Sequence, residues 1–177
     1  SFTVDKKIIE KELTNLGLEV ESIKSTTSNL ESMYVCEIIN VKKHPNADKL
    51  QICQLTTGKK NYSVVCGAYN AVKGLRSVFA PNGSYIPGKR FKLEKKKIRG
   101  IDGDGMLCSE EELGISSESA GIIELDKNYK VGKCFKEYVQ EDFVYEIALT
   151  PNRGDCASVR GIARDLAAKF FKKIKKK

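Results

Sequence analysis

The chain contains no tryptophan, a single histidine and no long apolar run. Because a membrane-spanning helix needs roughly 20 consecutive apolar residues, no span is predicted. The first residues, SFTVDKKIIEKEL, also lack the apolar core of a secretory signal, so we expect a cytoplasmic protein without a membrane partner. Six cysteines are present, but no CxxC pair exists and His44 is the only histidine, which leaves no ligand set for zinc. Cys36, Cys53, Cys66 and Cys108 lie in apolar or alternating runs and are expected to be buried, reduced thiols.

The solitary histidine also limits the chemistry that can be assigned. A general base needs a substrate proton and partner groups arranged around it, and the sequence around His44 identifies no nucleophile. We therefore predict no catalytic residue and no metal ligand in this chain.

Charge is abundant but unevenly distributed over the 177 residues, whose formal net charge is +8. Residues 42–99 hold 14 basic and 2 acidic side chains, whereas residues 102–126 hold 8 acidic side chains and no basic one. The last six residues, KKIKKK, add five lysines. A concentrated basic surface attracts phosphate groups by counterion release, so the middle of the chain is a candidate nucleic-acid surface.

The two ends of the chain show similar, mirrored patterns. Near the start, residues 5–16 predict a helix that ends at Gly17, followed by a strand over 18–23 and a polar linker over 24–32. Near the end, residues 143–149 alternate as a strand does, and Asp155 or Ser158 can cap the helix that follows. The apolar face of that helix comprises Val159, Ile162, Ala163, Leu166, Ala167 and Phe170. Both ends are expected to build one small α+β domain around an insertion.

The insertion reads as a series of short strands separated by turn residues. The expected strands are YVCEIINV, KLQICQLT, YSVVCG, RSVFA and FKLEKKKI, which start at residues 34, 49, 62, 76 and 91. Five short strands with glycine-rich connections are typical of a small barrel. A short helix is predicted after Ser109, because Glu112 stands three residues later as in a capping box.

Two motifs in the insertion suggest contacts with RNA phosphates. HPNAD, residues 44–48, predicts a rigid turn that orients Lys42, Lys43 and Lys49. The run KRFKLEKKKIR, residues 89–99, places many cations on a predicted strand and its loop. The alternative for these lysines is an edge strand that they protect from aggregation.

Two further segments, VVCGAYN at residues 64–70 and GMLCSEEELG at residues 105–114, carry small and polar residues suited to RNA. Asn70 could bond a base or ribose, Ser109 could donate to phosphate, and Tyr62 and Tyr69 could stack on unpaired bases. The alternative is that Asn70 belongs to a tight turn and Ser109 only caps its helix.

HPNADKLQICQL, VVCGAYN and GMLCSEEELG, in this order, resemble the tRNA-binding OB domain of aminoacyl-tRNA synthetases and their cofactors. TPNRGDCASVRGIARDLAA, residues 150–168, resembles the N-terminal region of the bacterial phenylalanyl-tRNA synthetase beta subunit, with Arg153, Arg160 and Arg164 expected to be exposed. The predicted fold class therefore combines α+β and all-β structure. A five-stranded OB-type β-barrel, residues 33–142, is inserted into a small α+β domain formed by residues 1–32 and 143–177.

The resemblance implies a non-catalytic N-terminal segment that contributes tRNA binding and structural support to the attachment of phenylalanine to its tRNA. It implies tRNA, the synthetase alpha subunit and the remaining beta-subunit domains as partners, in a heterotetramer. ATP and magnesium are implied for the full enzyme and no cofactor for this segment, which opens at Ser1 and is expected to be part of a far longer polypeptide. The predicted RNA-binding residues are Lys42, Lys43, Lys49, Asn70, Lys89, Arg90, Lys95, Lys97, Arg99 and Ser109.

Two other functions fit part of the pattern. A freestanding, dimeric tRNA-binding chaperone would explain the barrel motifs but not TPNRGDC. A purely architectural module would hold the synthetase together without touching RNA, since a fold does not carry function by itself.

Overall fold

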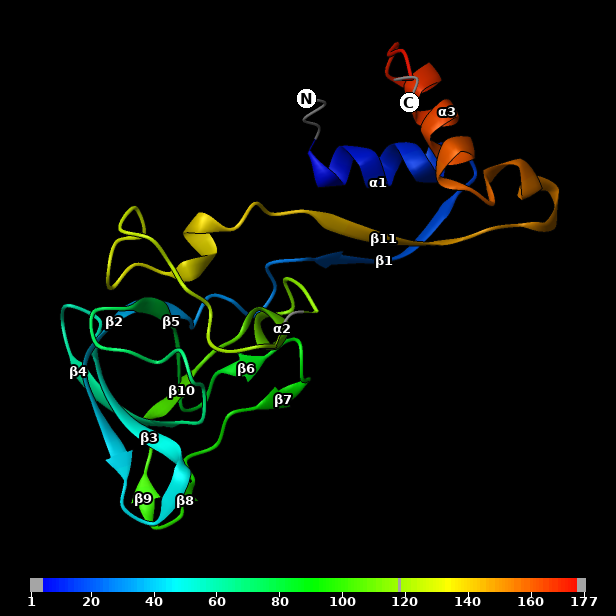
Figure 1. Ribbon diagram of the computed structural model, residues 1–177. Coiled ribbons are helices and arrows are strands. Elements are labelled where there is room, and N and C mark those ends of the chain that lie inside the picture. The colour runs from blue at the N-terminus through cyan, green and yellow to red at the C-terminus, as the bar shows by residue number, and fades with distance from the viewer. Residues whose placement is uncertain (1–4, 118, 175–177) are drawn as a thin grey trace. The chain divides into compact units, whose positions relative to one another are not determined.

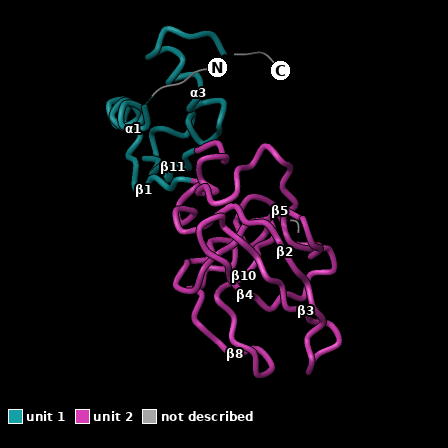
Figure 2. The backbone as a smooth tube through the Cα atoms, turned by 90° about the vertical axis from the view of Figure 1, so that its left-hand side faces the viewer, with its two compact units in different colours: residues 1–25, 142–177 teal, residues 26–141 magenta. Residues whose placement is uncertain are grey.

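The computed structural model describes residues 5–117 and 119–174, which form two compact units (Figure 2). Unit 1 comprises residues 1–25 and 142–177, and unit 2 comprises residues 26–141. The division falls at 25/26 and 141/142, whereas the sequence placed the domain limits at 32/33 and 142/143. Lysines 175–177 of the basic tail lie outside the described residues. None of the described helices is both long and apolar enough to cross a membrane.

Unit 1 contains the helices and strands predicted for the chain ends (Figure 1). Helix α1 (Lys6–Asn15) is capped by the Asp5 side chain, and the chain turns at Gly17, whose φ is +77°. Strand β1 (Glu19–Ser25) pairs antiparallel with β11 (Phe143–Ala148). A 3-10 turn, η2 (Pro151–Cys156), then leads into α3 (Val159–Lys169). Ser158 rather than Asp155 is the cap, because its side chain accepts the Gly161 N–H at 3.1 Å.

The core of unit 1 joins segments from both chain ends. Leu13, Leu18 and Cys156 are buried, and partly buried side chains from β1, β11 and α3 pack around them. One member of the predicted helix face is misplaced: Val159 is 88% exposed. It is the first helical residue, and the core contacts come from Ile162 and Leu166 further along.

The predicted polar linker over residues 24–32 is wrong. Strand β1 runs to Ser25, and Thr27 and Leu30 are fully buried within unit 2. Leu30 and Met33 pack beside Val35 and Phe135, so this segment is part of the folded unit despite its polar composition.

Unit 2 is built on an antiparallel five-stranded sheet in the order β10-β5-β2-β3-β4. Four strands lie where the sequence predicted them: β2 (Tyr34–His44), β3 (Ala47–Thr56), β4 (Asn61–Cys66) and β5 (Arg76–Pro81). Apolar side chains pack on both faces of β2 and β5, with Cys36 and Phe79 in one cluster and Val35 and Val78 in the other. Cys36, Cys53, Cys66 and Cys108 are buried, free thiols as predicted.

The predicted fifth strand over residues 91–98 is wrong. That segment is divided between β7 (Phe91–Lys92), which pairs with β6 (Tyr85–Ile86), and β8 (Lys97–Ile98), which pairs with β9 (Ile101–Asp102). Four consecutive charged residues, 94–97, leave it too little apolar surface to bury as a sheet strand.

The fifth strand is instead β10 (Gly105–Leu107), which precedes the short helix α2 (Glu110–Leu113). Gly105 permits this pairing, because a Cβ there would lie 2.1 Å from the Ala80 carbonyl oxygen. A short 3-10 helix, η1 (Phe135–Tyr138), lies near the end of the unit. The chain is therefore a mixed α/β protein with a mostly antiparallel sheet, and no β4–β10 strand ladder closes that sheet in the described residues.

Candidate nucleic-acid interface

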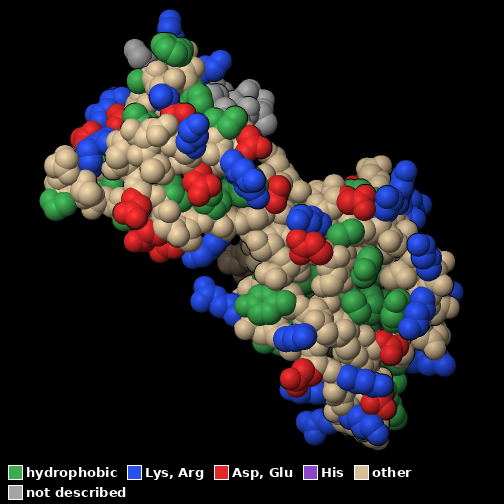
Figure 3. Space-filling view, turned by 180° about the vertical axis from the view of Figure 1, so that it is seen from behind, with side chains coloured by type: hydrophobic (Ala, Val, Ile, Leu, Met, Phe, Trp, Pro, Cys, Tyr) green, Lys and Arg blue, Asp and Glu red, His purple; other side chains and the backbone are tan. Residues whose placement is uncertain are grey.

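Two hairpin ends of unit 2, residues 42–49 and 95–102, form a basic surface that we call the basic tip (Figure 1 shows where these hairpins lie). It carries seven basic and two acidic side chains. Six predicted RNA-binding residues lie here, all exposed: Lys42, Lys43, Lys49, Lys95, Lys97 and Arg99. Figure 3 shows Lys and Arg side chains gathered at the bottom of the view with few acidic ones between them. The structure thus brings together cations from two motifs that are about 50 residues apart.

Most cations of the basic tip have no carboxylate partner. Lys97 lies 3.8 Å from Asp102 and Lys96 lies 3.9 Å from Glu94, and both exposed pairs are at the edge of contact. The other five cations form no ion pair with any residue in 5–117 or 119–174: Lys42, Lys43, Lys49, Lys95 and Arg99. Positive charge that is not neutralised internally is what a phosphate backbone requires.

His44 has a structural role in this tip that the sequence did not reveal. Its side chain is only 4% exposed, and its Nε2 lies 3.2 Å from the carbonyl oxygen of Ile98. Its Nδ1 accepts the backbone N–H of Asn46 at 3.1 Å. Because Nδ1 is an acceptor, Nε2 must carry the proton and donate to Ile98, which fixes the neutral tautomer. The Asn46 side chain adds a longer bond of 3.5 Å to the carbonyl oxygen of Arg99.

The other four predicted site residues lie elsewhere, in or beside a groove of about 650 Å³. Strand β4 and the loop after it, β10, α2 and residues 119–122 line this groove. Lys89 reaches the groove but pairs with Glu111 at 2.5 Å. Arg90 follows in the β6–β7 turn, exposed and with φ +55°. Glu111 and Glu112 line the groove together with one lysine, Lys89, so the charged side chains of its lining carry a net negative charge.

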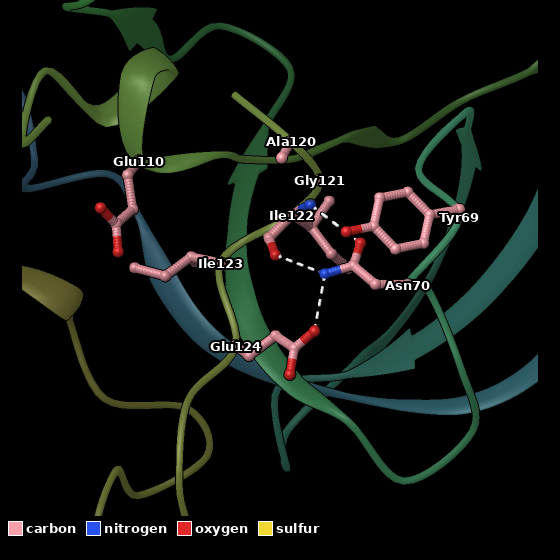
Figure 4. Close-up of a pocket in the computed structure, with 8 residues that line it drawn as sticks. All are labelled: Tyr69, Asn70, Glu110, Ala120, Gly121, Ile122, Ile123 and Glu124. Atoms are coloured by element: carbon pink, nitrogen blue, oxygen red, sulfur yellow. Dashed lines mark hydrogen bonds between the residues drawn. The ribbon is translucent and has the colours of Figure 1, made fainter. Parts of the chain in front are cut away.

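Asn70 is fully engaged inside the protein, as Figure 4 shows for a neighbouring pocket of about 270 Å³. Its Nδ2 donates to the Ile122 carbonyl at 2.8 Å and to Glu124 at 2.9 Å, and its Oδ1 accepts the Ile122 N–H at 3.1 Å. Gly121 is needed beside it, since a Cβ there would lie 2.5 Å from Oδ1. These bonds favour the alternative role of Asn70 as a structural residue.

Ser109 is also committed to local structure. Its hydroxyl accepts the Glu112 N–H at 3.2 Å, while the Glu112 carboxylate accepts the Ser109 N–H at 2.7 Å. The predicted capping box is confirmed, and Ser109 is only 6% exposed.

The two tyrosines proposed for base stacking differ in accessibility. Tyr62 packs against Phe79 with ring centroids 4.6 Å apart, so its ring is not free to stack on a base. Tyr69 is 78% exposed at the rim of the groove.

Three buried thiols of unit 2, Cys53, Cys66 and Cys108, have shifted pKa values. A hydrogen bond from the neighbouring Cys53 lowers the pKa of the Cys66 thiol, and the same hydrogen bond raises the pKa of Cys53. Burial raises the pKa of Cys108. Only Cys66 among these three reaches the groove wall.

Arg153 in unit 1 is not the exposed charge that the sequence predicted. Its side chain is 19% exposed and forms ion pairs with Asp155, at 3.3 Å, and with Asp165. It also donates to the Leu16 carbonyl oxygen and to Cys156 Sγ. Hydrogen bonds from Arg164 and Arg153 lower the pKa of Asp155, and a hydrogen bond from Arg164 together with lesser contributions lowers that of Asp165. TPNRGDC is therefore an internal ionic network that ties η2 and α3 to the end of α1.

Comparison with known proteins agrees with the tRNA-binding motifs. Residues 33–134 match the family model described as "Putative tRNA binding domain". The phenylalanine--tRNA ligase beta subunit of Novosphingobium aromaticivorans is 46% identical in sequence to this chain, and the match covers 93% of this chain. The same subunit of Rickettsia bellii is 49% identical, and the match covers 94% of this chain. The chain spans 21% and 19% of the lengths of these two proteins.

Among solved structures, the crystal structure of a MetRS related protein from Pyrococcus horikoshii aligns with 56% of this chain and 84% of that chain. Its sequence identity to this chain is 20% and its TM-score is 0.42. The resemblance found in the sequence motifs is confirmed by the family match and the two relatives. The chain belongs to the tRNA-binding domain family, and nearly all of it is similar to the N-terminal part of the phenylalanyl-tRNA synthetase beta subunit.

Proposed function

We propose that unit 2 binds tRNA through the basic tip, as part of a phenylalanine--tRNA ligase beta subunit. The observation that carries this proposal is the set of exposed cations of residues 42–49 and 95–102 that form no ion pair with a described residue. The contacts are with phosphates, because Lys and Arg side chains on a convex hairpin end supply charge but little shape for reading bases.

The proposal assigns unit 1 a supporting role and the chain no catalytic step. Phenylalanine attachment, ATP and magnesium belong to the remainder of the enzyme, with the alpha subunit and the other beta-subunit domains as partners in a cytoplasmic heterotetramer. In the part of the chain that the structure describes, Asp155, Cys156 and Asp165 form a group of possible metal ligands, with ligand atoms within 4.8 Å of one another. Arg153 and Arg164 already neutralise these carboxylates, so the set does not fit magnesium.

We also propose that unit 2 is an OB-type barrel and that the two units correspond to the two predicted domains. Support for closure comes from the segment just before β10, where the Asp104 N–H donates to the Ser63 carbonyl of β4 at 2.8 Å and the Asp104 carboxylate accepts the Ser63 N–H at 2.9 Å. These bonds bring the two outer strands of the sheet near one another without a regular ladder.

The proposal is tested by labelled-tRNA anisotropy across a salt titration, with the substitutions Lys95→Ala, Lys96→Ala, Lys97→Ala and Arg99→Ala combined. Loss of about four phosphate contacts is expected to reduce the slope of log K against log salt by roughly three, and the affinity at low salt by roughly 100-fold. The matched control replaces the tail lysines 172, 173, 175 and 176 with alanine, which removes the same number of charges. If only the tail variant loses binding, the basic tip is not the tRNA surface and unit 2 is architectural.

A further inference from the structure

The β8–β9 hairpin of the basic tip is too small to hold its own shape. Only two residue pairs define it, Lys97 with Asp102 and Ile98 with Ile101, and it forms a sheet separate from the five-stranded one. Residues 97–100 are all exposed. An isolated two-stranded hairpin is marginally stable in water even when it is longer than this.

The turn of this hairpin also contains a backbone conformation that its residue disfavours. Arg99 has φ +51° and Gly100 has φ +93°, so both central residues of the two-residue turn lie in the left-handed region. Such turns prefer Asn-Gly, and an arginine at the first position costs on the order of 1 kcal/mol. The hairpin therefore needs support from outside itself to present Arg99 in this way.

The support comes from the HPNAD turn at the end of β2. His44 Nε2–H donates to the carbonyl oxygen of Ile98 and the Asn46 side chain donates to that of Arg99, the two residues at the start of the strained turn. The Asn46 N–H holds the imidazole ring in place through Nδ1. Because His44 is nearly fully buried, this contact is part of the packed structure and not a chance surface bond.

We propose that His44 is a positioning residue for RNA binding, which fixes the β8–β9 hairpin so that Lys97 and Arg99 are held ready beside Lys42, Lys43 and Lys49. This proposal rests on the proposed function, since it names how that same surface is organised. Without the His44 bond, the hairpin would become ordered only when RNA binds. The free energy needed to order it would then be subtracted from the binding free energy, which lowers the affinity.

Two substitutions of His44 distinguish the hydrogen bond made by Nδ1 from the one made by Nε2. In His44→Asn the side-chain oxygen can replace Nδ1 and accept the Asn46 N–H, but no group reaches Ile98. In His44→Gln the longer amide can still donate to the Ile98 carbonyl. We expect His44→Asn to weaken tRNA binding about five- to tenfold and His44→Gln to stay within about twofold of the unaltered chain.

A double-mutant cycle distinguishes positioning from general destabilisation. In a Lys97→Ala, Arg99→Ala background, the two cations that His44 positions are gone, so His44→Asn should weaken binding less than twofold further. Equal loss in both backgrounds, or equal loss for His44→Asn and His44→Gln, would overturn the proposal.

Hydrogen exchange without RNA tests the hairpin separately from its function. Amides of residues 99–102 should exchange faster in His44→Asn than in His44→Gln, while amides of β3 and β4 should be unchanged. Unchanged exchange at 99–102 overturns the positioning role. Faster exchange together with no effect of Lys97→Ala, Arg99→Ala on tRNA affinity would instead show that the proposed function is wrong and that His44 only orders the hairpin.

Discussion

The basic tip of unit 2 and the arginine network of unit 1 differ in how far their cations are paired with carboxylates. In the basic tip of unit 2, five lysine and arginine side chains face solvent without an ion-pair partner among the described residues. In unit 1, Arg153 and Arg164 are surrounded by Asp155 and Asp165, and Arg153 also reaches the backbone at the end of α1. The comparison separates cations that the fold uses for its own ion pairs from cations that stay available to a phosphate backbone.

Lys89 is an intermediate case, because it is exposed and also paired with a carboxylate. It is exposed and sits in a strongly basic part of the sequence, yet its ammonium group pairs with Glu111 at the groove. Surface pairs of this kind contribute little to stability, but each one reduces the positive potential that a phosphate meets. The three cases make the comparison testable by substitution.

The largest effect is expected from Arg153→Met in unit 1. Methionine keeps much of the apolar stem but leaves Asp155 and Asp165 with one cation fewer and the Leu16 carbonyl without its donor. We expect the Tm of unit 1 to fall by several degrees, measured by calorimetry, with no change in tRNA affinity at a temperature where the variant is folded. Arg160→Met is the matched control, because Arg160 is exposed and pairs with no described residue, and it should leave the Tm nearly unchanged.

Acid should act on the same network in the unaltered chain. The pKa values of Asp155 and Asp165 are lowered in the folded state by their arginine hydrogen bonds. Their contribution is therefore present above the unfolded pKa of about 3.9 and is lost as the pH falls through the lowered folded values. Arg153→Met should reduce this acid-dependent loss, and an unchanged pH profile would contradict the network.

A smaller effect is expected when single lysines are compared. Lys43→Gln removes a cation without a carboxylate partner and should weaken tRNA binding about threefold, with the salt slope reduced by roughly one. Lys89→Gln removes a paired cation and frees Glu111, so neither the slope nor the affinity should change measurably. Equal losses for the two variants in the anisotropy titration would show that total charge, and not pairing, determines binding.

The smallest effect on stability is expected at the strained turn. Arg99→Asn places a residue that tolerates positive φ where arginine now stands, so unit 2 should gain a few tenths of a kcal/mol in denaturant unfolding. The same variant should bind tRNA about threefold more weakly. Stabilisation without weaker binding would remove Arg99 from the interface and leave its conformation unexplained.

Local sequence rules predicted the parts of the molecule whose causes are local. Short runs of strand length between turn residues predicted four strands of unit 2, three-four spacing predicted α1 and α3, and Ser109 with Glu112 predicted the cap of α2. The three-residue strand β10 was missed because it is shorter than a recognisable strand run and its pairing depends on the close approach of Gly105 to β5.

The candidate site depended more strongly on distant contacts. The bond from His44 to Ile98 spans 54 residues, and the bond from Arg153 to Leu16 spans 137. The sequence could supply the residue types but not the partner of each polar group. For that reason Asn70, Lys89 and Ser109 were grouped with Lys43 and Arg99, although only the latter two lie in the basic tip.

The register of β1 with β11 has a consequence for synthesis on the ribosome. Ser25 pairs with Phe143, so β1 finds its partner only after residues 26–142 have been made. At roughly 5–20 residues per second, that delay is about 6–23 seconds. During this interval unit 2 can complete its own sheet, while the apolar side chains of α1 and β1 have not yet met the β11 and α3 side chains against which they pack. The segment from α1 to β1 therefore depends on residues that are made later, and its apolar side chains have their packing partners only once β11 and α3 have been synthesised.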